Sequence, residues 1–148
     1  MTHHNEIYAA LILRVFLGVL FFAQGYDKIV KVKIRGVVET CEHPFITNHV
    51  PRWMLVLSAW FTSYVELICG FLLIIGFVKY YALYLLGIDL LMVTVAFCII
   101  EPMWDMRAVF PRMLLLLIAL MIPYQWDIIS VDWYWSLFRR LQSLGLFS

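Results

Sequence analysis

Four long apolar runs, separated by short polar segments, dominate the hydrophobic pattern of the chain. About 20 apolar residues are enough for a helix to cross the ~30 Å hydrocarbon core of a bilayer. Backbone polar groups in lipid must be bonded within their own helix, so each run is predicted to be a membrane-spanning helix. The predicted spans are residues 7–29, 53–78, 80–100 and 110–126. We therefore expect an all-α integral membrane protein, a four-helix bundle with a single domain over residues 1–148.

After the fourth run the pattern becomes that of an amphipathic helix, over about residues 130–145. Val131, Trp135 and Phe138 fall on one face, while Arg139 and Arg140 lie on or beside the other. The pattern favours a C-terminal interfacial helix that lies on the membrane plane. The alternative is a helix that docks onto a larger complex.

Four residues are predicted to anchor the bundle at the membrane interfaces. They are Lys28, whose tip is expected to reach the headgroups, and three aromatic residues, Trp53, Trp104 and Trp135. Lys and Arg residues are more numerous in the first and third loops than on the side of the termini. The positive-inside rule then predicts cytoplasmic loops and external termini, unless the basic terminal helix itself binds a cytoplasmic leaflet.

Composition supports the membrane class and excludes several kinds of chemistry. The chain has 148 residues, of which 64% are hydrophobic and only 14% charged, far from the norm for a soluble domain. The segment Cys41-Glu-His43 falls short of a zinc site, which usually needs four ligands. All four histidines lie outside the spans, which argues against a buried haem. No catalytic residue, metal site, covalent cofactor or nucleic-acid partner is predicted.

Three charged residues lie within the apolar runs and form the best candidate site. Helical rise places Arg14, Asp89 and Glu66 roughly 10, 14 and 18 Å below the membrane surface on the side of the termini. We expect them to share one layer, in which a single Arg faces two carboxyls. One of those carboxyls is then expected to be neutral, able to carry a proton or to bond a polar head group such as that of a quinone. The structural alternative is an ion pair that only fixes helix register.

Glycines accompany these charges on the same helix faces. Gly18 and Gly25 share a face of the first span with Arg14 and Lys28, and Gly70 follows Glu66 by four residues. Small residues allow another helix, or a flat ligand, to approach the backbone closely. The glycine faces of the first two spans are therefore predicted to oppose each other, and Gly18, Gly25, Gly70 and Gly76 are predicted to serve helix packing.

Two segments resemble a known family. The run from Arg14 to Lys28, RVFLGVLFFAQGYDK, resembles the first-helix signature of the DoxX family, and the run from Glu66 to Gly76, ELICGFLLIIG, resembles its second-helix signature. The positions that carry the likeness are Arg14, Gly18, Gly25, Lys28, Glu66, Gly70 and Gly76. Asp89 matches no family motif, and the Trp-rich end of the chain departs from the usual ending.

The resemblance implies a multi-pass protein of the bacterial or archaeal cytoplasmic membrane, related to the DoxD-like membrane subunit of thiosulfate:quinone oxidoreductase. The leading hypothesis is a membrane subunit of a redox assembly, with other membrane subunits as partners, whose charged layer contacts a quinone or relays a proton. The second hypothesis is a non-catalytic accessory subunit that stabilises a larger complex. A small transporter has less support, because no internal repeat is visible.

Overall fold

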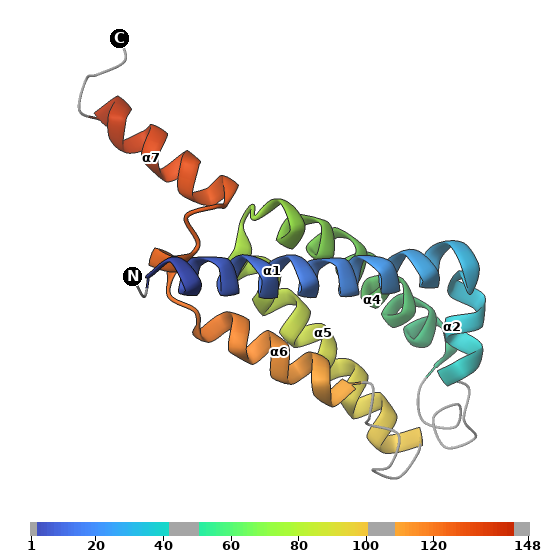
Figure 1. The fold of residues 1–148 in the computed structure, drawn as a ribbon. Helices are drawn as coiled ribbons and strands as arrows, with labels where there is room; N and C mark the ends of the chain where they lie inside the picture. The colour runs from blue at the N-terminus through green and yellow to red at the C-terminus, as the bar shows by residue number, and fades with distance from the viewer. Residues whose placement is uncertain (1–2, 42–50, 101–108, 144–148) are drawn as a thin grey trace.

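The computed structural model describes residues 3–41, 51–100 and 109–143, and every regular element in these ranges is helical. The elements, labelled as in Figure 1, are α1 (His3–Tyr26), η1 (Asp27–Lys31), α2 (Lys33–Cys41), α4 (Arg52–Ile75), α5 (Lys79–Ile100), α6 (Val109–Met121), η3 (Tyr124–Trp126) and α7 (Val131–Ser143). The chain is a helical membrane protein, and no strand occurs in the described part.

Three segments of helix are long and apolar enough to cross a membrane: His4–Lys31, Arg52–Ile75 and Lys79–Ala96. The predicted fourth span over residues 110–126 is wrong in length, because α6 has only 13 residues and ends at Met121. At 1.5 Å per residue it extends roughly 20 Å, less than the hydrocarbon core. Pro123 explains this end, since proline has no N–H to continue the helical bonding and its ring clashes with the preceding turn.

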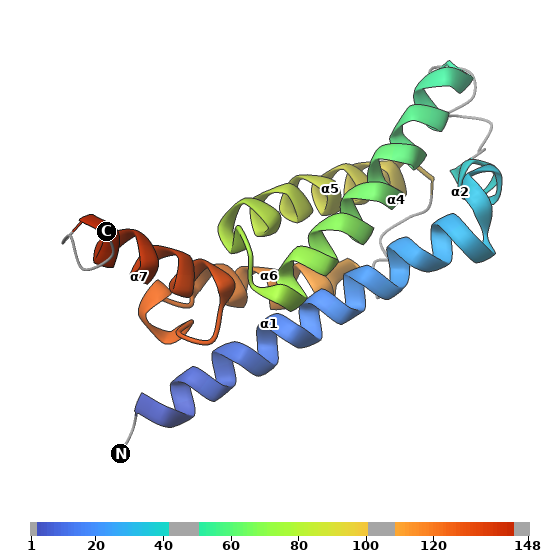
Figure 2. The same cartoon turned by 90° about the horizontal axis from the view of Figure 1, so that it is seen from above.

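Helices α1 and α4 pack side by side along much of their length (Figures 1 and 2). Their backbones approach closely at the glycines: a Cβ atom added to Gly25 would lie 2.4 Å from Leu67 N, and one added to Gly70 would lie 2.4 Å from Phe22 N. Gly18 and Gly70 face each other, because a Cβ on either would lie 2.9 Å from the carbonyl oxygen of the other. Only residues without a side chain permit this separation.

The turn between α4 and α5 is short and conformationally demanding. Gly76 ends α4 in the left-handed region at φ 76°, where a side chain is disfavoured. Its N–H and that of Phe77 both donate to Leu72 O, which satisfies the end of the helix. Gly76 therefore ends α4, whereas the glycines at 18, 25 and 70 serve close helix packing.

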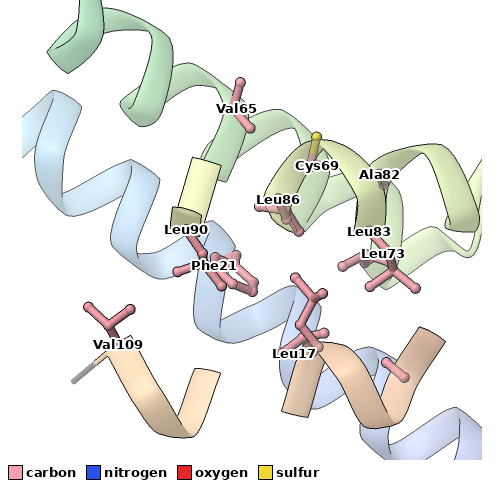
Figure 3. Packing of buried hydrophobic residues seen from close by; sticks show 12 residues of the cluster. Leu17, Phe21, Val65, Cys69, Leu73, Ala82, Leu83, Leu86, Leu90 and Val109 are labelled. Carbon is pink, nitrogen blue, oxygen red and sulfur yellow. The ribbon is translucent and has the colours of Figure 1, made fainter. Parts of the chain in front are cut away.

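An apolar core joins the four helices α1, α4, α5 and α6 (Figure 3). Leu17 and Phe21 of α1, Leu73 of α4 and Leu83 and Leu86 of α5 have no exposed surface. Large apolar side chains also cover the outside of the bundle, among them Ile12, Leu57 and Tyr81, each more than 60% exposed. An apolar outer surface on helices of spanning length indicates contact with the lipid bilayer.

Candidate functional site

The buried charges form two clusters at different levels of the bundle. The first, which we call the terminal cluster, consists of Arg14, Lys79 and Asp127, all nearly inaccessible to solvent. Arg14 Nη1 donates to Asp127 Oδ1 at 2.5 Å, and Lys79 Nζ lies 3.2 Å from Asp127 Oδ2. Arg14 Nη2 also donates to the carbonyl oxygen of Ile129 at 2.6 Å. This cluster fastens the segment that follows α6 to α1 and to the start of α5.

The second, the inner cluster, consists of Lys28, Thr62, Glu66 and Asp89. Lys28 Nζ lies 2.6 Å from Glu66 Oε2, and Thr62 Oγ1 donates to Asp89 Oδ1 at 2.7 Å. Glu66 and Asp89 are 1% and 0% exposed, whereas the Lys28 side chain keeps 25% of its surface. Arg112 of α6 adds a further positive charge to the electrostatic surroundings of Glu66. The cluster therefore places two carboxyls inside the bundle, beside a lysine that reaches its surface.

Lys28 lies in η1, a π-helical turn that continues α1. Turns of this type are rare and occur often at functional sites. Lys28 was predicted to be an interface anchor whose tip reaches the headgroups. The structure adds an ion pair with Glu66, which that prediction did not include.

The predicted layer of Arg14, Glu66 and Asp89 is divided between the two clusters, and the predicted pairing of Arg14 with Glu66 is wrong. The register of α1 on α4 explains the division. Gly25 lies against Leu67 and Gly18 lies against Ile74. The α1 residues opposite Glu66 therefore lie near the C-terminal end of α1. They are about twelve residues, or roughly 18 Å, beyond Arg14. Lys28 can reach Glu66 from there, and Arg14 cannot.

One buried oxygen of the inner cluster has unused hydrogen-bonding capacity. Within the described residues, Asp89 Oδ2 has no hydrogen-bond partner, and neither does the side-chain oxygen of Gln24 on α1, which is not part of this cluster. Glu66 Oε2, in contrast, is paired with Lys28 Nζ at 2.6 Å. Buried polar atoms normally find partners, so acceptors of this kind are suited to a proton or to a donor group on a ligand.

The predicted aromatic anchors and the Cys41–His43 segment lie outside the two clusters or outside the described residues. Trp53 at the start of α4 is 66% exposed and Trp135 on α7 is 56% exposed, while Trp104 lies outside the described residues. His43 also lies outside them, and Cys41 is the last residue of α2. In the ranges that the structure describes, no three His, Cys, Asp or Glu side chains come together as a possible metal site.

Sequence reasoning missed two members of the terminal cluster. Asp127 and Lys79 both lie outside the predicted spans: Asp127 directly follows the fourth span, and Lys79 lies between the second and the third. One signal was present: Asp127 is a single acid between the apolar Trp126 and Ile128, directly after the helix break at Pro123. An isolated acid in such a setting is expected to have a buried cationic partner.

Together, the fold and the two clusters define a helical integral membrane protein that holds ionisable side chains between its spans. A family model described as DoxX matches residues 9–99, and the chain belongs to the DoxX family. No curated protein and no solved structure matches the chain. The matched segment contains the whole inner cluster, whereas Asp127 lies beyond it.

Proposed function

We propose that the chain is a membrane subunit of a redox or electron-transport assembly in the cytoplasmic membrane of a bacterium or archaeon. In this proposal the inner cluster contacts a quinone-like head group or relays a proton. The observation that carries it is the burial of Glu66 and Asp89, at 1% and 0% exposure, inside helices of membrane-spanning length. Ionisable groups in such positions are costly and mark substrate, ion or proton pathways by default.

The chemistry of the cluster fits such a head group. Lys28 can donate to a quinone carbonyl oxygen, and Asp89 Oδ2 can accept from the hydroxyl of the reduced form. Reduction of a quinone takes up two electrons and two protons. The carboxyls would exchange the protons, and another subunit of the assembly would supply the electrons.

The experiment replaces Glu66→Gln and Asp89→Asn in the native assembly and measures quinone binding and quinone-linked electron transfer. Both variants keep the size of the side chain and remove its ability to carry a negative charge. We expect each to reduce turnover at least ten-fold while the amount of assembled protein stays near that of the unmodified chain. Glu39→Gln on the exposed face of α2 is the matched control. Unchanged binding and turnover in both variants would eliminate the proposal.

A second candidate is a non-catalytic accessory subunit that stabilises a larger membrane complex. The observation that favours it is that Arg14, Lys28 and Lys79 all form ion pairs within the chain. Buried polar contacts of this kind fix how membrane helices associate. Under this candidate, loss of Arg14 or Glu66 lowers the amount of folded subunit, and the activity of each remaining complex is unaltered.

A further inference from the structure

The base of α7 is fixed to the bundle by hydrogen bonds. Ser130 Oγ accepts from Trp133 N at 3.2 Å, which caps the helix, and donates to Asp127 O at 2.7 Å. Asp132 Oδ2 accepts from Lys79 N at 3.0 Å, and Asp132 N donates to Gly76 O at 3.1 Å. The first turn of α7 therefore continues the terminal cluster and cannot swing freely.

The rest of α7 points away from the bundle (Figures 1 and 2). None of its residues is buried, and Tyr134 and Trp135 are 62% and 56% exposed. An exposed apolar stripe runs along one side of the helix and consists of Val131, Tyr134, Trp135, Leu137, Phe138 and Leu141. A fixed helix that presents such a side needs an apolar environment to cover it.

The charged residues of α7 indicate which kind of surface covers its apolar side. Its single acidic residue, Asp132, is held by the backbone of Lys79, and the only other charged residues are Arg139 and Arg140, both exposed near the outer end. The outer part of the helix therefore carries two positive charges and no negative one. Such a surface is complementary to an anionic layer.

We propose that α7 binds the surface of the bilayer that surrounds the bundle, and that anionic lipid in that surface is required. The apolar side enters the boundary between headgroups and acyl chains, and Arg139 and Arg140 contact lipid phosphate groups. Charge favours lipid over a protein partner of unspecified charge, because α7 begins at the end of a bundle with an apolar outer surface, and its exposed apolar residues are accompanied by Arg139 and Arg140 and by no free acidic side chain.

The test measures hydrogen–deuterium exchange of residues 131–143 in the full-length chain. The protein is reconstituted in nanodiscs of phosphatidylcholine alone, or of phosphatidylcholine with phosphatidylglycerol. A basic residue near an anionic surface contributes about five-fold in binding, so exchange of α7 is expected to be on the order of 25-fold slower with phosphatidylglycerol. The R139Q/R140Q variant is expected to exchange at one rate in both lipids, and high salt is expected to remove the difference in the unmodified chain.

A charge-matched control is K33Q/R35Q, which removes two exposed basic residues from α2 and should leave the exchange of α7 unchanged. Equal exchange of the unmodified α7 in both lipids would overturn the proposal. Protection that appears only in the native assembly, and not in either nanodisc, would also overturn it and would assign α7 to a protein partner. Because exchange is read locally along the chain, a variant that unfolds is recognised by faster exchange in α1 and α4.

Discussion

Asp127 is the anion that two buried cations share. Its two carboxylate oxygens lie 2.5 Å from Arg14 Nη1 and 3.2 Å from Lys79 Nζ. Removal of one member of a buried ion pair leaves a charge without compensation, which is more destabilising than replacement of the whole pair by apolar groups. The stability of the end of the bundle that holds α7 therefore depends on this carboxylate.

Replacement of Asp127→Asn is expected to lower the free energy of unfolding by about 3–5 kcal/mol. The measurement is denaturant unfolding of the purified chain in a mild detergent. Asp27→Asn is the control, because the Asp27 side chain is 49% exposed and its pair with Lys31 lies at the surface. Such a pair contributes about 1 kcal/mol or less. Equal losses for the two variants would contradict the role assigned to the terminal cluster.

Individual site residues could be chosen from the sequence, but their partners could not. Arg14, Glu66 and Asp89 were selected as charges within apolar runs, and all three are at most 3% exposed. The pairing of these residues was predicted from their depth in the membrane alone. Depth gives no information on how far one helix is shifted along another. The contact of Gly25 with Leu67 sets that shift and brings Lys28, not Arg14, to Glu66.

Among the elements, the contact between α1 and α4 has the least tolerance for change. A methyl group on Gly25 would meet the backbone of Leu67 at 2.4 Å, and backbone cannot move aside as the end of a side chain can. Because the same contact sets the register, its loss would also displace Lys28 from Glu66.

Gly25→Ala is expected to lower stability by about 1–3 kcal/mol, as overpacking does in other closely packed interiors. Gly87→Ala is the matched control on α5, since the added methyl group would meet nothing closer than Leu116 Cδ2 at 3.7 Å. Alanine is the better helix former, so Gly87→Ala is expected to be neutral or stabilising by up to about 1 kcal/mol. Thermal unfolding of the two variants in one detergent distinguishes them, and similar melting temperatures would refute the predicted close approach.

The sequence predicted the helical elements more accurately than their ends. The predicted spans over 53–78 and 80–100 correspond to α4 and α5, with the turn where Gly76 stops the helix. The fourth run looked long enough because Tyr124 and Trp126 continue its apolar character, although Pro123 ends the helical bonding before them. Apolar composition predicts which segments lie in lipid. The end of a helix depends instead on backbone chemistry at one or two residues, such as a proline or a glycine.

At the scale of the whole molecule, the two clusters lie toward opposite ends of the bundle. The start of α1 and the base of α7 are at one end, and α2 is at the other (Figure 1). The terminal cluster fixes this arrangement, because Arg14 of α1 contacts residues that follow α6. The ends of the described chain should therefore face one side of the membrane, with α2 on the other.

Single cysteines introduced by Asn5→Cys and Ser143→Cys, in a chain without its natural cysteines, are expected to react with a membrane-impermeant maleimide from the same side of sealed vesicles. Glu39→Cys on α2 is expected to react only from the opposite side. All three positions are exposed, so differences in labelling report sidedness and not burial within the protein. Labelling of positions 5 and 143 from opposite sides would be inconsistent with the fold.

The ion pair between Arg14 and Asp127 joins residues 113 positions apart, which has a consequence for biosynthesis. At the usual 5–20 residues per second, Arg14 leaves the ribosome about 6–23 s before its partner. During that interval the first span must enter the bilayer with a guanidinium that has no carboxylate beside it, and a charge in that state is drawn toward water and headgroups. We therefore expect α1 to insert first in a shallower position and to reach its final depth only after the segment behind α6 has been synthesised.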